Sequence, residues 1–354
     1  MSNLPKDLSD LPRDLEEEVL SKVPVTYLRR VRSTCKKWNT LSRCRSFAKK
    51  HLAQARVAAA KEKAFMVVMM MDFRVYLMRV HLDNKVDLCM KRQGTLICPD
   101  ASDQIYVRQV FHCDGLLLCI LKDNPRLVVF NPYCGQPRWI DATNSSYQRL
   151  ENCCYALGVL DVTGDWRIAS YSRGVSLNGN TYWFAQNMNS ATLGQVGHSF
   201  LLCFDFTRET FGPRLPLPFE LFPQDNVTLS NVRDEQLAVL FQCDDTLQME
   251  IWVTTKIEPN SVSWSSKFFL SVDMAVLTAS DKFKFSYMAS SFFIDEEKKV
   301  AVVYDKSKDR KMKRNTAYII GEDRSLKEVD LGESPNQFIQ PFVCSYVPSS
   351  MQLE

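Results

Sequence analysis

"LSDLPRDLEEEVLSKVP", residues 8–24, is the stretch that decides how the front of the chain folds. Its apolar residues recur at every fourth position: Leu11, Leu15, Val19 and Val23. This spacing predicts a short helix with one apolar stripe, and Leu20 adds apolar surface outside the stripe. One small core cannot use all of this surface. We therefore expect something other than the helix's own neighbours to cover part of it.

The ends of this first helix carry residues that are typical of helix termini. Asp10 can cap the free N–H groups at the start, and Pro12 fits the opening turn. Acidic residues follow in the first turns, where they suit the positive end of the helix dipole. Pro24 is expected to end the helix.

A second helical run follows, with a basic opposite face. Its apolar positions come at helical spacing: Leu28, Val31, Cys35, Trp38, Leu41 and Phe47. Residues 1–60 hold 13 Lys or Arg and 6 Asp or Glu, whereas the rest of the chain is slightly acidic. Nucleic acid is not the expected partner, because the basic residues interleave only with Trp38, which belongs to the apolar series.

Length and composition predict two domains of an ordinary globular protein. The chain has 354 residues, of which 45% are hydrophobic and 24% are charged, so it can bury a sizeable core. The helical front has only about 45 residues and no disulfide or metal, which is near the lower size limit of an independent domain. It therefore needs a partner surface.

The sequence shows no secretion signal, no membrane helix and no metal or cofactor motif. The N-terminus has no apolar signal-peptide core, and no run approaches the ~18 apolar residues of a membrane helix. We expect an intracellular protein without a membrane partner. The twelve cysteines are interpreted as reduced core residues, because no Cys-x-x-Cys occurs. The four histidines are scattered, so we expect them to be structural or exposed, with no metal and no cofactor.

From residue 64 onwards, short apolar runs separated by turn residues predict strands rather than long helices. Four units of strand, turn and strand recur: GLLLCIL with LVVF, GNTYWFA with FLLCFDF, QLAVLFQ with EIWVTT, and KVAVVYD with AYIIG. Their starts are 64, 57 and 63 residues apart. This period is longer than the ~40–50 residues of common propeller repeats, but it fits blades with long loops. We expect a β-propeller-like array.

Three motifs that could suggest a functional site have simpler structural interpretations. "GVSLNGNT", residues 174–181, nearly spells a phosphate-binding loop, but Asn180 replaces the lysine and a strand follows in place of a helix. Asn178-Gly179 instead predicts a tight hairpin turn. Asp244-Asp245 is interpreted as a solvated acid pair in a turn. The basic run 306–314 is interpreted as a solvated loop, with a nuclear localisation signal or a contact for an acidic partner as the alternatives.

The front of the chain closely resembles the F-box. The matching residues are LPRDL at 11–15, VLSKVP at 19–24, LRRVR at 28–32, Cys35-Lys36, Trp38, Leu41 and Phe47. The resemblance implies a helical module that docks on a Skp-type adaptor, which is attached to a cullin scaffold with a RING subunit in an SCF ubiquitin ligase. The residues expected to bind the adaptor are Leu11, Pro12, Leu15, Val19, Leu20, Pro24, Leu28, Val31 and Trp38.

The remainder resembles the plant F-box-associated domain of type 1. The matching stretches include LVVFNPYCGQPRWI, YALG, RGVSLNGNTYWFA and LLCFDFTRETFGPRLPLPF. In that family YALG leads into a further strand-rich stretch, whereas here Gly158 joins Val159 directly. This departure implies that a blade, or most of one, is missing, and it puts closure of the array in question.

These observations predict an α+β multidomain protein, in which a small all-α module precedes an all-β, kelch-like or β-propeller-like domain. The expected boundaries are 1–50 for the F-box module, 51–63 for a helical linker, 64–345 for the β domain and 346–354 for a tail. The expected function is that of a non-catalytic substrate receptor of an SCF ligase. The alternatives are a non-ligase binding scaffold, an inactive paralogue with a truncated β domain, and a propeller enzyme, for which the sequence displays no metal or acid-base cluster.

Overall fold

The computed structural model describes most of the chain. The described residues are 12–23, 27–61, 64–82, 88–95, 106–122, 127–133, 135–140, 155–156, 158–159, 166–168, 174–187, 199–222, 224–233, 235–286, 291–308, 314–334 and 341–349.

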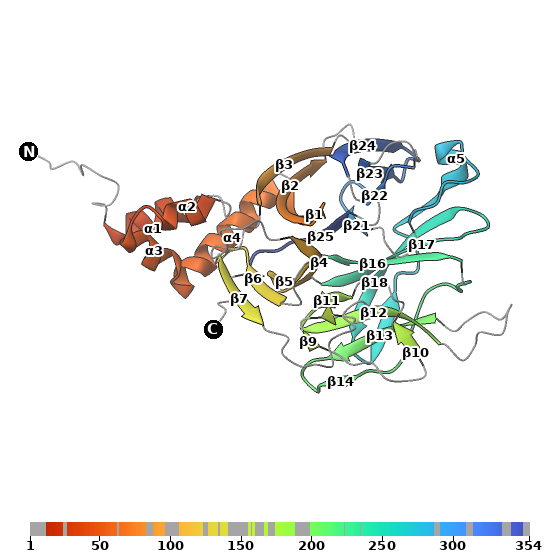
Figure 1. Ribbon diagram of the computed structural model, residues 1–354, viewed down its shortest axis with the longest axis horizontal. Helices are drawn as coiled ribbons and strands as arrows, with labels where there is room; N and C mark the ends of the chain where they lie inside the picture. Colours follow the sequence, from red (N-terminus) through yellow and green to blue (C-terminus); the bar gives the residue numbers. More distant parts are fainter. Residues whose placement is uncertain are drawn as a thin grey trace, which may run out of the picture.

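Four helices form the N-terminal module, which lies on one side of the β domain, at the left of Figure 1. Their bounds are α1 (Arg13–Ser21), α2 (Leu28–Arg32), α3 (Lys36–Ser42) and α4 (Arg45–Lys61). The second predicted run is thus divided among three helices. Cys35 separates α2 from α3, because its extended backbone ends the helical path and its sulfur accepts the Trp38 N–H at 3.4 Å. Helix α4 runs through the boundary expected between residues 50 and 51.

The first helix begins and ends close to the predicted limits. Pro12 occupies the N-cap position and makes no side-chain capping bond, while Asp10 lies outside the described residues. The helix ends at Ser21, and Lys22 forms its C-cap. Pro24, the expected stop, is also outside the described residues.

Five antiparallel sheets, which we call blades 1 to 5, make up the β domain. Blade 1 has the order β25 (Phe342–Ser345), β1 (Ala64–Met71), β2 (Arg74–Leu82) and β3 (Leu88–Thr95). Blade 2 contains β4 (Val107–Cys113), β5 (Leu116–Leu121), β6 (Leu127–Asn131) and β7 (Gln136–Ile140). Blade 3 contains β10 (Trp166–Ile168), β11 (Val175–Leu177), β12 (Asn180–Asn187), β13 (Ser199–Asp205), β14 (Thr210–Phe211) and β15 (Leu215–Pro216).

Blades 4 and 5 follow in the same way. Blade 4 contains β16 (Asn226–Val232), β17 (Gln236–Gln242), β18 (Gln248–Glu258), β19 (Ser261–Trp264) and β20 (Leu270–Asp273), after which comes the short helix α5 (Met274–Thr278). Blade 5 contains β21 (Ser291–Asp295), β22 (Val300–Lys306), β23 (Arg314–Gly321) and β24 (Leu326–Glu333). A separate two-stranded pair, β8 (Tyr155–Ala156) and β9 (Gly158–Val159), lies between blades 2 and 3 in the sequence.

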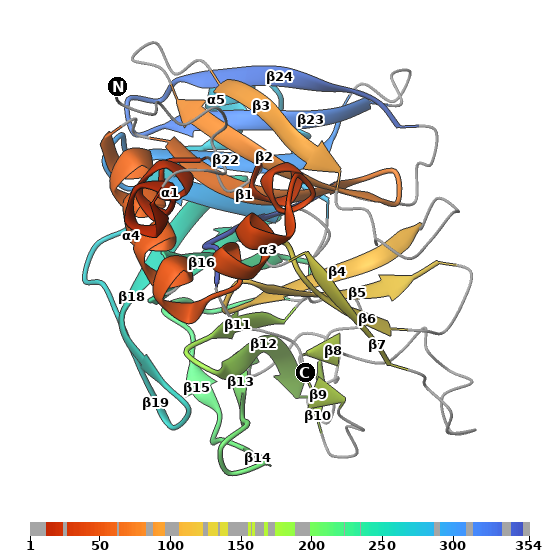
Figure 2. The ribbon, with the colours of Figure 1, turned by 90° about the vertical axis from the view of Figure 1, so that its left-hand side faces the viewer.

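The five blades surround a common axis, as the view from the helical side shows (Figure 2). A cavity of about 40 Å³ on this axis is lined by one strand from each blade. Representative lining residues are His112, Ser176, Asn231, Ser291 and Val343. The last strand, β25, closes the ring, because it pairs with β1 and so belongs to blade 1. The expected array is therefore a five-bladed β-propeller.

The four predicted hairpin units are the middle strands of four different blades. They correspond to β5–β6, β12–β13, β17–β18 and β22–β23. These strands read as apolar runs because side chains on both of their faces are buried. The Asn178-Gly179 turn is confirmed, since both residues have positive φ and Leu177 pairs with Asn180.

The packing between blades identifies one seam that differs from the others. Side chains of blade 1 share apolar clusters with blades 5 and 2, blade 5 shares one with blade 4, and blade 4 shares two with blade 3. The remaining faces of blades 2 and 3 form separate clusters, around Leu118 and Trp183 respectively. Within the described residues, the inner strands β4 and β11 make the contact between these two blades.

Candidate docking surface on the helical module

Two residues of the apolar stripe, Leu15 and Val19, face away from the rest of the chain, whereas Val23 packs against the core of the helical module. Leu15 is 49% exposed and Val19 is 46% exposed, although both are large aliphatic residues. They lie one helical turn apart on the same face of α1. Pro12, at the start of the same face, is exposed as well. Most helices of this size direct their apolar stripe into the core, so these two exposed residues form a candidate contact surface.

Two of the nine predicted contact residues lie inside the module instead. Leu20 and Leu28 are buried in a cluster that includes Leu41, Phe47 and Leu52. At 100° per residue, Leu20 is about 140° around the helix from Leu15, so the two side chains face opposite ways. In this structure Leu20 and Leu28 are therefore buried within the helical module, while Leu15 and Val19 are exposed on its outside.

Val31 and Trp38 are partly buried at the edge of the same cluster. Leu11 and Pro24, the other two predicted contact residues, lie outside the described residues. One exposed aromatic residue was not predicted: Tyr27 is 51% exposed, and the Arg30 guanidinium lies 5.6 Å from its ring centroid. It precedes the periodic series that begins at Leu28, which is why helical spacing did not identify it.

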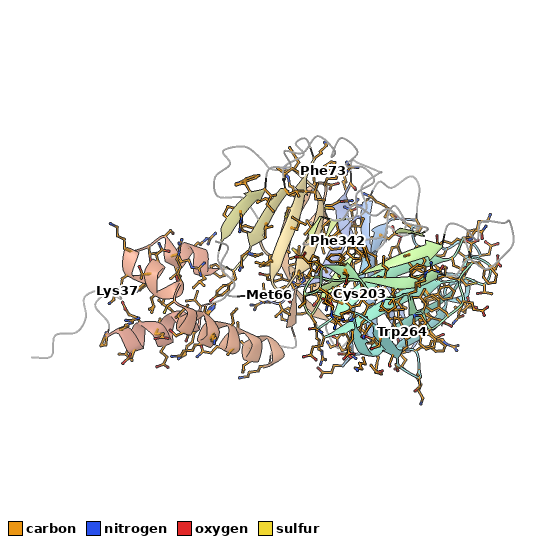
Figure 3. All side chains as sticks on the ribbon, turned by 90° about the horizontal axis from the view of Figure 1, so that it is seen from below. Lys37, Met66, Phe73, Cys203, Trp264 and Phe342 are labelled. Atoms are coloured by element: carbon orange, nitrogen blue, oxygen red, sulfur yellow. The ribbon has the colours of Figure 1, made fainter. Side chains whose placement is uncertain are left out.

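A buried carboxylate holds α1 against α3. Glu16 is almost fully buried, and its carboxylate accepts the Trp38 indole N–H at 3.2 Å and pairs with the Lys37 ammonium at 2.9 Å. Burial raises the pKa of Glu16, but the hydrogen bonds from Lys37 and Trp38 outweigh burial and lower it below the usual glutamate value. Figure 3 shows Lys37 on the helical side of the molecule, well away from Phe73 of the propeller.

The other charged motifs of the sequence have structural partners. Asp244, in the turn between β17 and β18, pairs with Lys284 at 2.5 Å. Lys308, in the basic run, pairs with the buried carboxylate of Asp305 at 2.6 Å, and residues 309–313 of that run are outside the described part. His51 and His112 are buried, His81 is half-buried on β2, and His198 is not described.

The described residues contain neither a metal-binding cluster nor a membrane-spanning helix. No group of three or more His, Cys, Asp or Glu side chains in that part of the chain is arranged to hold a metal ion. None of the helices in the same part is long and apolar enough to cross a membrane.

Fold and surface together define a class of protein: a small helical module with an outward apolar stripe, joined to a five-bladed propeller. Comparison with known families identifies both parts. The F-box domain matches residues 8–50, and the F-box associated beta propeller domain matches residues 66–159 and 158–353. The chain belongs to the family of F-box proteins with an F-box-associated β-propeller, a pair of domains that supports a role as substrate receptor of SCF ligases in general.

Relatives from Arabidopsis thaliana match nearly the whole chain. F-box/kelch-repeat protein At3g16740 is 50% identical over 399 residues, covering 98% of this chain and 99% of the relative. F-box protein At3g19470 is 51% identical over 389 residues, covering 97% of this chain and 99% of the relative. Both alignments are longer than the 354 residues present here, so the relatives contain positions that this chain lacks. The propeller match is also divided at residues 158 and 159, where the sequence analysis places the missing segment.

Proposed function

We propose that this chain is the substrate receptor of an SCF ubiquitin ligase, in which the helical module docks on a Skp-type adaptor and, through it, on the cullin and RING subunits. The observation that carries the proposal is the outward stripe of Leu15 and Val19, together with the match to the F-box over residues 8–50. The predicted contact set then divides by position. Pro12, Leu15 and Val19 meet the adaptor directly, Val31 and Trp38 flank them, and Leu20 and Leu28 keep the helices in place.

The exposed stripe supplies part of the binding energy that a stable complex needs. Covering an exposed Leu, Val or Tyr side chain contributes ~1.5–3 kcal/mol in gross terms. Leu15, Val19 and Tyr27 start about half exposed, so each offers part of that amount, and the costs of association are subtracted from the sum. A tight complex therefore needs further contacts around the stripe, which the exposed proline and the partly buried Val31 and Trp38 can provide.

In this proposal the chain performs no bond chemistry of its own. It acts inside the cell, where the ligase works, and it raises the local concentration of a target near a ubiquitin-charged enzyme. The helices occupy one end of the propeller, where they contact the β6–β7 turn (Figures 1 and 2). The opposite end, which carries α5 and the β17–β18 turn, is the end left free for a target.

The adaptor surface is tested by changing its two exposed aliphatic residues. Leu15→Asp and Val19→Asp together are expected to reduce co-purification with a Skp-type adaptor by at least about tenfold, because two charges would be desolvated at the contact. The variants should stay folded, since neither side chain is part of the core. Binding is measured by pull-down and by calorimetry with the purified adaptor.

A matched control comes from α4. Val57 is 69% exposed and lies beyond the stretch that matches the F-box, so Val57→Asp adds the same charge to another exposed valine of the helical module. It is expected to bind the adaptor like the wild type. Equal binding by the double variant and by Val57→Asp would rule out the α1 stripe as the docking surface.

A scaffold or inactive paralogue is the second candidate, and the seam between blades 2 and 3 favours it. The propeller match is interrupted there, and the described apolar clusters of the two blades are not shared. This candidate predicts a wild-type chain that binds no adaptor or melts well below a full-length relative. Side-by-side melting curves and adaptor binding of both proteins distinguish it from the receptor.

A further inference from the structure

One residue of the propeller lies inside the core of the helical module. Tyr133, in the turn between β6 and β7, is only 2% exposed, and it packs in the same cluster as Leu20, Leu28 and Phe47. A turn residue at the end of a blade would ordinarily face solvent. Here its ring completes a core that the helices alone leave open.

Polar contacts join Tyr133 to two buried residues of the helices. The Arg32 guanidinium donates to the Tyr133 carbonyl oxygen at 2.7 Å, and it also lies 5.5 Å from the Tyr133 ring centroid. Arg32 is held by Ser42, whose hydroxyl accepts its Nε–H at 3.1 Å and whose carbonyl accepts a second N–H at 3.3 Å. One arginine thus connects α2, the end of α3 and the propeller turn.

His51 of α4 provides a second connection. Its ring is fully buried and stacks on Phe47. The Nε2 atom lies 2.6 Å from the Val23 carbonyl oxygen, and the Nδ1 atom lies 3.1 Å from the Tyr133 hydroxyl. A carbonyl can only accept, so Nε2 carries the hydrogen and Nδ1 accepts the hydrogen of the phenol. Burial lowers the pKa of His51, the hydrogen bond to the Val23 carbonyl opposes this effect, and the nearby Arg32 adds to it, so the net shift favours the neutral ring.

The turn is anchored on its propeller side by a separate set of contacts. The Asn131 side chain accepts the Tyr133 N–H at 2.8 Å and donates to the Ser349 carbonyl oxygen at 3.1 Å. Ser349 belongs to the stretch after β25, in which Tyr346 is buried and its hydroxyl donates to the Gly115 carbonyl oxygen at 3.5 Å. The end of the chain therefore holds the β6–β7 turn against the base of blade 2.

We propose that Tyr133 is a positioning residue that fixes the direction of the helical module relative to the propeller, with Arg32 and His51 gripping it from one side and Asn131 from the other. Domains joined only by a connecting chain move relative to each other by default. A buried residue with hydrogen bonds at both its backbone carbonyl and its side-chain hydroxyl removes that freedom. The consequence for ubiquitin transfer rests on the proposed function: a fixed direction sets the distance from the target end of the propeller to the enzyme that carries ubiquitin.

The test measures the distance between the two domains in the full chain. Spin labels are attached through an unnatural amino acid at Thr40 on α3 and Val276 on α5, which are both exposed, so the native cysteines are left intact. The wild type is expected to give one narrow distribution of distances between the labels, measured by double electron–electron resonance. Tyr133→Ala should shift and broaden it, because both the ring and the hydroxyl are lost, while Tyr133→Phe should stay close to the wild type in width.

Controls separate loss of position from loss of folding. Tyr106→Ala removes a partly exposed tyrosine from another propeller loop and should leave the distribution unchanged. If circular dichroism shows that Tyr133→Ala unfolds the helices, the distance distribution is measured instead in Asn131→Ala. That variant loosens the β6–β7 turn without changing a side chain of the helical core. A narrow, unshifted distribution in folded Tyr133→Ala, or in Asn131→Ala where Tyr133→Ala is unfolded, would overturn the proposal. Adaptor binding by these variants is measured separately, so a wild type that fails to bind adaptor counts against the proposed function and not against the fixed direction.

Discussion

At the scale of single residues, His112 shows how the inside of the ring constrains a titratable group. The ring lies on β4 beside the axial cavity, buried, with its Nε2 accepting the Gly115 N–H at 3.2 Å and with Tyr346 packed edge-on against it. Burial lowers the pKa of His112 to about 4 from the usual 6.5. The native state therefore holds the neutral form, which the hydrogen bond at Nε2 also requires.

This environment predicts a specific loss of stability in mild acid. Below pH 6.5 the unfolded chain binds a proton at His112 that the native state rejects, so stability falls as the pH drops from 6.5 towards 4. The slope approaches about 1.4 kcal/mol per pH unit, and the total is at most about 3.5 kcal/mol. His112→Gln keeps an acceptor for Gly115 but cannot be protonated, so its urea denaturation midpoint should depend less on pH in this window. If the urea midpoints of the wild type and His112→Gln changed equally with pH, His112 would not be the source of the acid sensitivity.

At the scale of elements, the β4–β5 turn and the stretch after β25 depend on each other. Gly115 has φ +76°, and a Cβ at this position would overlap the Ser349 side chain and lie 2.8 Å from the Val347 carbonyl oxygen. Gly179, in the β11–β12 turn, also has positive φ, but a Cβ there would meet nothing within 4 Å. A Cβ at Gly179 would cause only backbone strain, whereas a Cβ at Gly115 would cause backbone strain and a steric clash with residues 347–349.

We expect the two alanine substitutions to differ in cost. Gly179→Ala should destabilise the protein by roughly 1–3 kcal/mol, the cost of placing a residue with a Cβ in the left-handed region. Gly115→Ala should cost about 1–3 kcal/mol more, because the end of the chain must also move. Urea denaturation of both variants measures the difference. Equal costs would mean that residues 346–349 are not held tightly against this turn.

At the scale of the whole molecule, the ring is closed by pairing between strands that lie far apart in the sequence. Four residue pairs, from Val67 with Ser345 to Met70 with Phe342, join β1 to β25. Removing residues 341–354 should therefore leave the inner edge of β1 unpaired and expose the apolar surface that blade 1 shares with its neighbours.

The expected result of this truncation is a lower melting temperature and a transition that broadens or splits in calorimetry, because the blades no longer support one another around a closed ring. Removing only residues 350–354 keeps β25 and the Asn131 contact with Ser349, and it serves as the control. A single sharp transition at the wild-type temperature in the longer truncation would show that β25 is dispensable for closure.

The sequence by itself determined the elements and the class of the molecule. Period-four spacing identified α1, and apolar runs identified the middle strands of the blades. Asn178-Gly179 identified a hairpin turn. Each of these signals depends only on residues that are close together in the sequence. The expectation of a helical module followed by an all-β propeller is confirmed. The blade count was less accessible, since some inner and outer strands, such as β11 and β14, have only three or two residues and so carry little pattern.

Only the tertiary structure decided which surfaces meet. Spacing alone could not show that Leu20 and Leu28 are interior while Leu15 and Val19 are exposed, because that depends on which side the other helices occupy. It also could not place Tyr133 in the helical core, beside Arg32, which lies 101 residues earlier. Contacts of this range are fixed by the packing of the complete fold, whereas local periodicity records only the direction in which each side chain leaves its own element.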